Sequence, residues 1–369
     1  MESRLSGSRG LKRLSSVGAV PQPPRCASVA VGSLPYEDAR RAMDLILECT
    51  PEIPAWPQLP RRSFLENMYV QFSEGLPGAN LDLDAQRFWV SDEPPADDVA
   101  DFVERLALDN LDLFAVSADR AAGLAVLEAA LSSSASAGSP PPYVKGQVTG
   151  PVSFGLSVLR EDRRGLLFDD TQRELATTLL AEKARWQERR LRFWAPASVP
   201  LIVFDEPYLA QIGSAFVNVP RELYLPLLEQ CLEPLECLKG IHICGGADWE
   251  SVVALAIDLL SFDAADHLDS VTTQREAFAS FVAKGGLLAW GAIPNDDRAM
   301  SLGAEEVGRR ILGGAEALEQ TGAVSVDEIL LSSLVSPACG TGALPVEVAE
   351  RCFRLGAETS AWLRRHLSG

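Results

Sequence analysis

The sequence predicts a single α/β domain, a (β/α)8 TIM barrel with an insertion after the second strand. Short β-rich runs alternate with longer amphipathic stretches, as in chains built from βα units. Polar residues gather where the β-rich runs end, and barrel enzymes carry their active sites at that end of the strands. The chain has 369 residues, 47% of them hydrophobic, which is enough for one large buried core.

Eight segments have the apolar composition of parallel strands buried on both faces. They are Ser28–Leu34, Ile53–Leu59, Tyr143–Thr149, Leu201–Asp205, Gly240–Cys244, Leu259–Asp263, Leu287–Ala292 and Leu330–Val335. The second segment is the weakest strand candidate because prolines interrupt it.

Four stretches have helical periodicity, namely Tyr36–Glu48, Thr171–Arg192, Ala304–Gln320 and Pro345–Arg365. Residues 73–142 depart from the alternation, although Ala118–Leu131 is helix-like, and we expect this insertion to cover one end of the barrel. Residues 1–27 are basic and rich in serine and glycine, so we expect a disordered extension there and a barrel over residues 28–369.

The composition argues against several classes of protein. A formal net charge of −18 disfavours binding to nucleic acid or to an anionic membrane surface. No apolar run approaches the roughly 18 residues that span a bilayer. The 7 cysteines are scattered and there is no secretory signal, so we expect a cytoplasmic protein without disulfides. The oligomeric state is not predicted.

The motif GIHICGG predicts a metal site. Residues two apart on a strand face the same side, so His242 and Cys244 point together at a strand end. Cys339, in the loop-like SPACGTG, follows the last predicted strand and supplies a third ligand. Zn²⁺ favours such nitrogen and sulfur ligands, and a catalytic zinc site leaves one position open. Asp263 is a candidate oxygen ligand, displaceable or in the surrounding shell.

The alternative to a metal site is that these residues have a purely structural role. A histidine and a cysteine two residues apart are a weak signal alone, because buried cysteine is usually a small apolar filler. The other five cysteines have no partner at ligand spacing and are interpreted as structural: Cys26, Cys49, Cys231, Cys237 and Cys352. Cys231 and Cys237 are expected on a helical stretch, and Asp248 is expected to cap a helix that opens near Trp249.

Six motifs resemble the catalytic domain of cobalamin-independent methionine synthase. They are VGSLP (31–35), QVTGPVSF (147–154), FDEP (204–207), HIC (242–244), SFD (261–263) and SPACG (336–340). The wider superfamily includes uroporphyrinogen decarboxylase and the methylcobalamin:coenzyme M methyltransferases. The decarboxylases lack the zinc cysteines and need basic residues for a substrate rich in carboxylates, so that member fits this acidic, thiol-rich site poorly.

The resemblance implies a zinc-dependent S-methyltransferase of methionine biosynthesis, with zinc held by His242, Cys244 and Cys339 and with Asp263 where the family has a glutamate ligand. It also implies that Asp205, together with Glu206, binds the substrate ammonium group, and that Gly32 and Ser33 bind its carboxylate. Homocysteine or a related small thiol is the expected acceptor. The competing interpretation of Asp205 is a carboxylate that orders the loop before Pro207.

Two departures from the family bear on the methyl donor. The family's second, N-terminal barrel has no counterpart in 369 residues, and Ser157 stands where the family has a tryptophan against which folate packs. A methyl-corrinoid, carried by a partner protein, is therefore expected in place of folate. Two other functions stay open: a non-catalytic or regulatory barrel that binds a small thiol or a corrinoid partner, and zinc-dependent formation or cleavage of a C–S bond.

Overall fold

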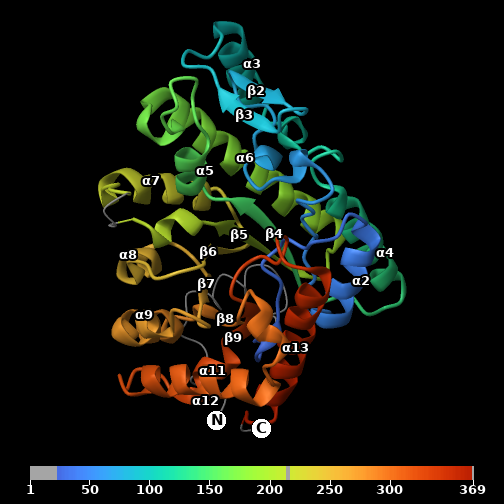
Figure 1. The fold of residues 1–369 in the computed structure, drawn as a ribbon, viewed down its shortest axis with the longest axis vertical. Coiled ribbons are helices and arrows are strands. Elements are labelled where there is room, and N and C mark those ends of the chain that lie inside the picture. The colour runs from blue at the N-terminus through green and yellow to red at the C-terminus, as the bar shows by residue number, and fades with distance from the viewer. Residues whose placement is uncertain (1–22, 213–216, 368–369) are drawn as a thin grey trace.

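The computed structural model describes residues 23–212 and 217–367 and centres on a curled parallel sheet (Figure 1). Seven strands follow one another in the order β1-β9-β8-β7-β6-β5-β4. Their bounds are β1 (Ala27–Ser28), β4 (Tyr143–Thr149), β5 (Val199–Asp205), β6 (Leu238–Ile243), β7 (Leu259–Asp263), β8 (Leu287–Ile293) and β9 (Ser333–Pro337). Because the strands are parallel, all their C-terminal ends meet at one edge of the sheet.

Helices lie around the outside of this sheet (Figure 1). They are α2 (Ala39–Cys49), α3 (Ala96–Ala107), α4 (Ala122–Ser136), α5 (Pro151–Ser157), α6 (Asp170–Trp194), α7 (Arg221–Leu232), α8 (Trp249–Ala254), α9 (Leu268–Thr273), α10 (Arg275–Ala283), α11 (Ala304–Glu319), α12 (Val326–Leu331) and α13 (Val346–Arg364). The four helices predicted from periodicity are confirmed as α2, α6, α11 and α13, with ends shifted by a few residues.

The predicted last strand, 330–335, begins too early. Its first two residues close α12, which starts with a capping box between Ser325 and Glu328. A run of two leucines fits a buried helix end as well as a strand, and the cap upstream decides between them. The strand β9 therefore starts at Ser333.

The segment 52–58 does not form a continuous strand, although it lies where the second strand was predicted. Backbone N–H groups of Tyr143 and Lys145 donate to the carbonyls of Glu52 and Pro54, at 3.1 and 2.9 Å. On its other side, Gln58 donates to the carbonyl of Gly32 at 3.1 Å. Proline has no N–H to donate, which explains why the pairing is reduced to isolated bridges.

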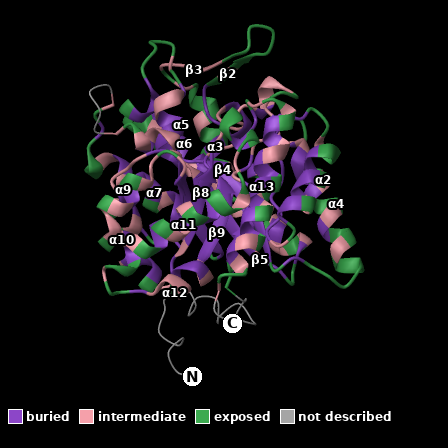
Figure 2. Cartoon of the chain, turned by 60° about the horizontal axis from the view of Figure 1, so that its bottom comes forward, coloured by how far each residue is buried: buried purple, intermediate pink, exposed green. Residues whose placement is uncertain are grey.

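Side chains on the inner face of the sheet form a separate apolar core. Val29, Ile53, Val203 and Leu334 belong to it, while the outer faces of the strands pack against the helices. Figure 2 shows the strands buried at the centre and the helices exposing their outer surfaces. Because strand residues alternate between faces, the inner face continues toward the C-terminal edge with polar side chains.

The insertion of residues 73–142 contains an antiparallel hairpin, β2 (Ala79–Asp82) and β3 (Arg87–Val90), which the sequence did not indicate. The hairpin and α3 lie together at one end of the molecule (Figure 1). Val90 donates its N–H to the carbonyl of Leu159 at 3.0 Å, so the hairpin is attached to the loop after α5. The helix-like segment predicted from residue 118 is confirmed as α4, which starts at Ala122.

The expected disordered extension, 1–27, falls mostly outside the described residues, which begin at 23. Within the described part, Cys26 is buried and donates its N–H to the carbonyl of Ser333 at 2.7 Å, and β1 starts at Ala27. These last residues of the predicted extension are therefore part of the packed domain.

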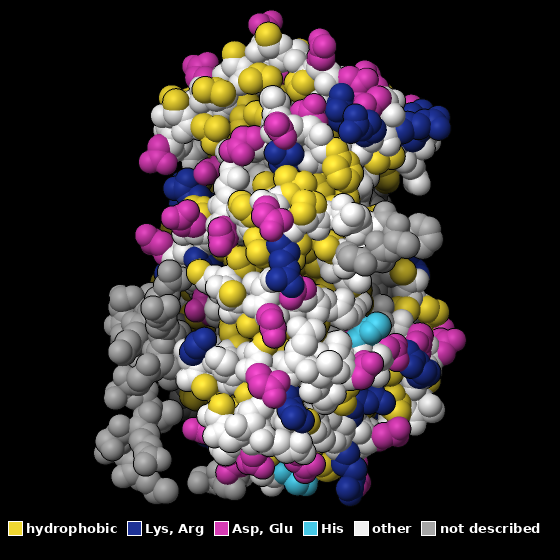
Figure 3. Space-filling view, turned by 90° about the vertical axis from the view of Figure 1, so that its left-hand side faces the viewer, with side chains coloured by type: hydrophobic (Ala, Val, Ile, Leu, Met, Phe, Trp, Pro, Cys, Tyr) yellow, Lys and Arg dark blue, Asp and Glu magenta, His cyan; other side chains and the backbone are white. Residues whose placement is uncertain are grey.

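The surface shows no large field of one charge on the face in Figure 3, where acidic and basic side chains are interspersed. In the described part of the chain, no helix combines the length and the apolar character needed to cross a membrane.

Candidate active site

Three ligand-type side chains meet at the C-terminal edge of the sheet, as the sequence predicts. His242 lies on β6, Cys244 directly follows that strand, and Cys339 lies in the loop after β9. One nitrogen of the histidine and the two sulfurs all lie within 4.8 Å of one another. The chain folds β6 and β9 into one sheet, and this brings together residues that are about a hundred positions apart in the sequence.

The histidine is oriented by a neighbouring strand. Its Nδ1 is 2.8 Å from the hydroxyl oxygen of Ser261 on β7, and Ser261 stands beside His242 in the sheet register. Its other nitrogen, Nε2, is buried and has no hydrogen-bond partner among the described residues. A metal-binding histidine usually forms a hydrogen bond through one ring nitrogen, and this leaves the lone pair of the other nitrogen free to bind the metal. The signal for Ser261 was present in the motif SFD, but its role depends on register.

The two thiols influence each other's ionisation. A hydrogen bond from Cys244, with further help from His242 and the backbone of Gly340, lowers the pKa of Cys339, and the pKa of Cys244 is raised because its proton is held in that bond. Cys339 is therefore the thiol of the pair that loses its proton first. Thiolate and neutral imidazole are the donors that zinc prefers, so these residues fit the metal that the sequence predicts.

Asp263 lies outside this cluster. Its Oδ1 accepts the N–H groups of Ala265 and Asp266 at 2.8 and 2.9 Å, and its Oδ2 is 4.0 Å from Nε2 of His267. The carboxylate thus orders the turn after β7 and is not one of the side chains gathered around His242. Its pKa is raised, chiefly by burial.

Asp205 ends β5 and stands beside His242 in the register. It is on the inner face, and its Oδ1 is buried without a hydrogen-bond partner in the described part of the chain. Burial raises the pKa of Asp205 to about 6, while the charges of Lys145 and His242 act in the opposite direction. An unpaired buried carboxylate oxygen beside the cluster is available to a cationic group of a ligand.

Glu206, predicted to act together with Asp205, points the other way. Its carboxylate accepts the backbone N–H groups of Val152 and Ser153 at 2.9 and 2.8 Å and the hydroxyl of Ser153 at 2.6 Å. It therefore caps α5, whose first N–H groups have no partner within the helix. Gly150 lacks a side chain for this reason, since a Cβ there would come within 2.2 Å of Oε1 of Glu206.

The predicted first strand, 28–34, is shorter in the structure, where β1 covers Ala27–Ser28, and Ser33 lies in the segment after it and contacts the Cys339 loop. Its carbonyl accepts the N–H and the hydroxyl of Thr341, each at 2.9 Å, and its Oγ accepts the N–H of Gly342 at 3.2 Å. Gly32 precedes it, and its carbonyl is bonded to Gln58. Ser33 therefore contacts the cluster loop, whereas the neighbours of Gly32 are Gln58 and Gln147.

Sequence reasoning missed Lys145. It lies on β4, is fully buried, and donates to the carbonyl of Val31 at 2.5 Å and to Oε1 of Gln147 at 3.3 Å. A cavity of about 10 Å³ is lined by Lys145, Asp205 and His242. A lysine in the middle of a strand buried on both faces was the available signal.

Two other expectations changed with the structure. Asp248 stands at the cap position of α8 as predicted, but its side chain makes no capping hydrogen bond and forms an ion pair with Arg221 at 2.6 Å. Cys237 is not on a helix: it comes just before β6, while Cys231 lies in α7 as expected. Both cysteines are buried.

No protein-family model matches this chain, and a comparison with curated proteins finds no match either. Solved structures do match. A proposed vitamin-B12-independent methionine synthase from Listeria monocytogenes aligns over 90% of this chain and 86% of its own, with 14% identity and a TM-score of 0.52. A methyltransferase from Methanosarcina mazei aligns over 94% and 97%, with 13% identity and a TM-score of 0.49.

A B12-independent methionine synthase from a Shewanella species aligns over 61% of this chain and 63% of its own length, with 18% identity and a TM-score of 0.45. This chain thus covers less than two thirds of the Shewanella protein. The Listeria match shows that the chain has the fold of that structure, and the predicted resemblance is confirmed at the level of the fold.

Proposed function

We propose that this chain is a zinc-dependent methyltransferase that activates a small thiol, homocysteine or a related compound, for methylation. The observation that carries the proposal is the cluster of His242, Cys244 and Cys339, in which the buried Nε2 of the histidine has no described partner. An uncompensated buried nitrogen beside two thiols is costly unless a ligand binds there.

Zinc held by these three residues would supply a Lewis acid that lowers the pKa of a bound substrate thiol. The chain's own residues would bind and orient the substrate. Asp205 offers its free carboxylate oxygen to the substrate ammonium group, and the proposed partner of the substrate carboxylate is the backbone of Gly32 and Ser33. Lys145 holds Val31 and thereby the start of that loop.

We further infer that the segment 52–58 serves as the eighth strand and closes a single (β/α)8 barrel over residues 28–369. Its isolated bridges to β4 and to Ser33 support this inference. The proposed methyl donor is a methyl-corrinoid on a partner protein, in a reducing, cytoplasmic setting where the thiols stay free.

Metal analysis of purified variants tests the proposal. The protein should contain close to one zinc per chain, and Cys339→Ser should lose most of it, because a zinc site with two of its three protein ligands is far weaker. Cys352→Ser is the matched control, since Cys352 is a buried cysteine on α13 and is not one of the three clustered residues. Asp263→Asn should keep its zinc, because that carboxylate bonds to backbone N–H groups instead.

Two further measurements distinguish a catalytic from a structural metal site and identify the methyl donor. Homocysteine added to the zinc protein should release about one proton per chain if the metal keeps an open position, and none if the metal is only structural. Assays with methylcobalamin and with methyltetrahydrofolate, each with homocysteine, identify the donor. A protein that carries no zinc when it is folded would contradict the proposal.

A further inference from the structure

The loop that carries Cys339 is bonded on one side to the end of β8. Before the cysteine, Ala338 donates its N–H to the carbonyl of Ile293, the last residue of β8, at 2.9 Å. Directly after the cysteine, the carbonyl of Gly340 accepts a hydrogen bond from Nδ2 of Asn295 at 3.0 Å. The backbone on both sides of Cys339 is therefore fixed to the same strand end.

The segment after β1 holds the loop from the other side. The carbonyl of Ser33 accepts both the N–H and the hydroxyl of Thr341 at 2.9 Å, and Oγ of Ser33 accepts the N–H of Gly342 at 3.2 Å. The approach is close, since a Cβ at Gly340 would lie 2.2 Å from Oγ of Ser33. The Cys339 loop is thus held between two parts of the chain that are far apart in the sequence.

Asn295 contributes to this arrangement in spite of a cost to stability. The residue is half-buried, and its Oδ1 is buried without a hydrogen-bond partner among the described residues. A buried acceptor without a partner destabilises a fold, and a leucine of similar size would avoid that cost. What the amide supplies, and leucine would not, is the bond from Nδ2 to the loop of a cluster residue.

We propose that Asn295 is a positioning residue that holds Cys339 at the cluster. The contact between Ser33 and Thr341 acts on the same loop from the other side. This inference rests on the proposed function, because it concerns a residue that would hold the zinc. Ligands that are fixed before the metal arrives lose less freedom when it binds, and the partners that orient metal ligands raise metal affinity by roughly 10- to 100-fold.

Cobalt(II) titration of the full-length protein, freed of metal by a chelator, tests the proposal. The charge-transfer absorption between thiolate and cobalt reports binding directly. Asn295→Leu should move half-saturation to an about tenfold higher cobalt concentration, while the unfolding temperature of the metal-free protein stays within a few degrees of wild type. A merely structural role predicts the reverse, a lower unfolding temperature with unchanged affinity for cobalt.

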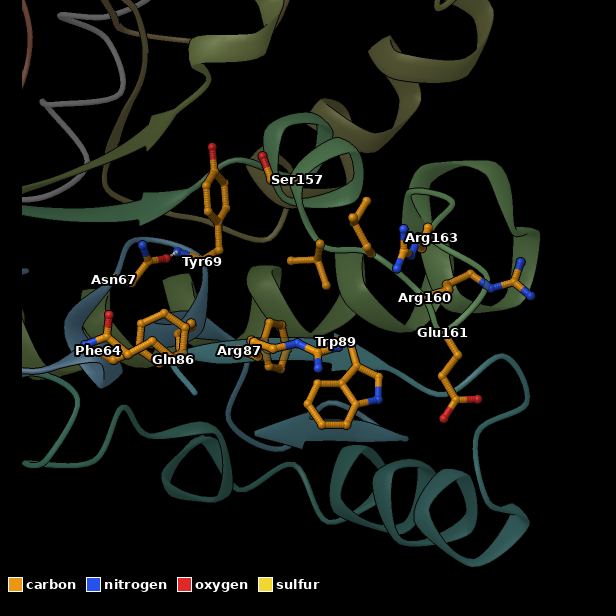
Figure 4. A pocket seen from close by; sticks show the side chains of 14 residues that line it. Phe64, Asn67, Tyr69, Gln86, Arg87, Trp89, Ser157, Arg160, Glu161 and Arg163 are labelled. Carbon is orange, nitrogen blue, oxygen red and sulfur yellow. Dashed lines mark hydrogen bonds between the residues drawn. The ribbon is translucent and has the colours of Figure 1, made fainter. Parts of the chain in front are cut away.

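Asn80→Leu is the matched control. Nδ2 of Asn80 donates to the carbonyl of Gly78 at 2.8 Å, so this substitution removes the same kind of bond from β2 of the hairpin. The hairpin forms one wall of a pocket of about 850 Å³ through residues 86–89 (Figure 4), and neither Asn295 nor Thr341 lines that pocket. Asn80→Leu should therefore leave the affinity for cobalt unchanged.

Thr341→Val tests the other side of the loop. It removes the hydroxyl bond to Ser33 and keeps the backbone N–H bond to the same carbonyl, so we expect a smaller loss of cobalt affinity than for Asn295→Leu. Thr341→Ser restores a hydroxyl and should recover the affinity of wild type. Thr359→Val is the control, because Thr359 is buried and its hydroxyl has no hydrogen-bond partner in the described part of the chain.

Hydrogen exchange followed by mass spectrometry gives a readout without metal. Asn295→Leu should raise the exchange of the peptide 338–344 in the metal-free protein, and unchanged exchange there would contradict the proposed contact. The cobalt titration separates the two proposals. If wild type binds cobalt and Asn295→Leu binds it equally well, only the role of Asn295 is wrong. If wild type binds neither cobalt nor zinc, the proposed function is wrong and this inference with it.

Discussion

Lys145 is buried inside the domain, which is an unusual environment for a lysine. Its ammonium group lies inside the curled sheet and is hydrogen bonded to Val31 and Gln147. Burial lowers the pKa of Lys145 to about 8, while the charge of Asp205 acts in the opposite direction. The charge is thus retained near neutral pH in an interior where it costs free energy.

This pKa predicts a pH dependence of stability. Between about pH 8 and the unfolded value of 10.5, the unfolded chain binds the lysine proton and the folded chain does not. Stability contributed by Lys145 therefore rises with pH across this window and is constant below it. The free energy of unfolding of wild type should rise relative to that of Lys145→Met by up to roughly 3 kcal/mol.

Urea unfolding at pH 7.5 and pH 10 measures this difference, with Lys284→Met as the control that removes the same charge from an exposed position. Parallel curves for wild type and Lys145→Met at both values of pH would show that the buried ammonium group keeps its ordinary pKa.

At the scale of elements, α5 depends on a residue from another strand end. The helix has seven residues and begins with Pro151, and Glu206 supplies the acceptors that its first turn lacks. Burial raises the pKa of Glu206 to about 7, and its hydrogen bonds with Ser153 and the backbone of Val152 act against that rise. The carboxylate predicted to serve catalysis is thus committed to holding α5 against β5.

Glu206→Gln should therefore affect folding before it affects the cluster. An amide cannot accept at its nitrogen, so one of the three donors loses its partner and the free energy of unfolding should fall by about 1–3 kcal/mol. Zinc content should stay unchanged. Glu222→Gln, at an exposed position in the first turn of α7, is the control and should be close to neutral. Zinc loss without loss of stability would instead assign Glu206 to the metal site.

For the whole molecule, the hairpin is an addition that the sheet does not need. Its two strands pair with each other and with no strand of the central sheet, and the residues at its base are close, since Ser91 donates its N–H to the carbonyl of Gly78 at 2.9 Å. Val90 at its base is buried and Asn80, Phe88 and Trp89 are half-buried, while the other residues of its two strands are exposed.

Replacement of residues 80–89 by Asn-Gly should therefore leave the rest of the domain folded. Ala79 and Val90 are register partners, and Asn-Gly forms the two-residue turn that joins such a pair. We expect zinc content to be retained and the unfolding temperature to change by only a few degrees. Global unfolding of this variant on calorimetry would show that the hairpin is structural.

Much of the fold and part of the site followed from local patterns. Continuous apolar runs located six strands of the sheet, because parallel strands buried on both faces have that composition. The spacing of His242 and Cys244 placed them on one side of a strand end, since strand residues alternate. The start of β9 could not be predicted, because the apolar pair Leu330–Leu331 satisfies a helix and a strand equally.

The sequence by itself determined which residues reach the C-terminal edge of the sheet. The tertiary structure decided which of them meet there. His242, Cys244 and Cys339 converge, whereas Asp263 bonds to its own turn and Glu206 caps α5. It also brought Lys145 beside Asp205 and formed a pocket between two segments far apart in the chain. The physical reason is that periodicity sets the face of a side chain, while strand register and crossing loops set its neighbours.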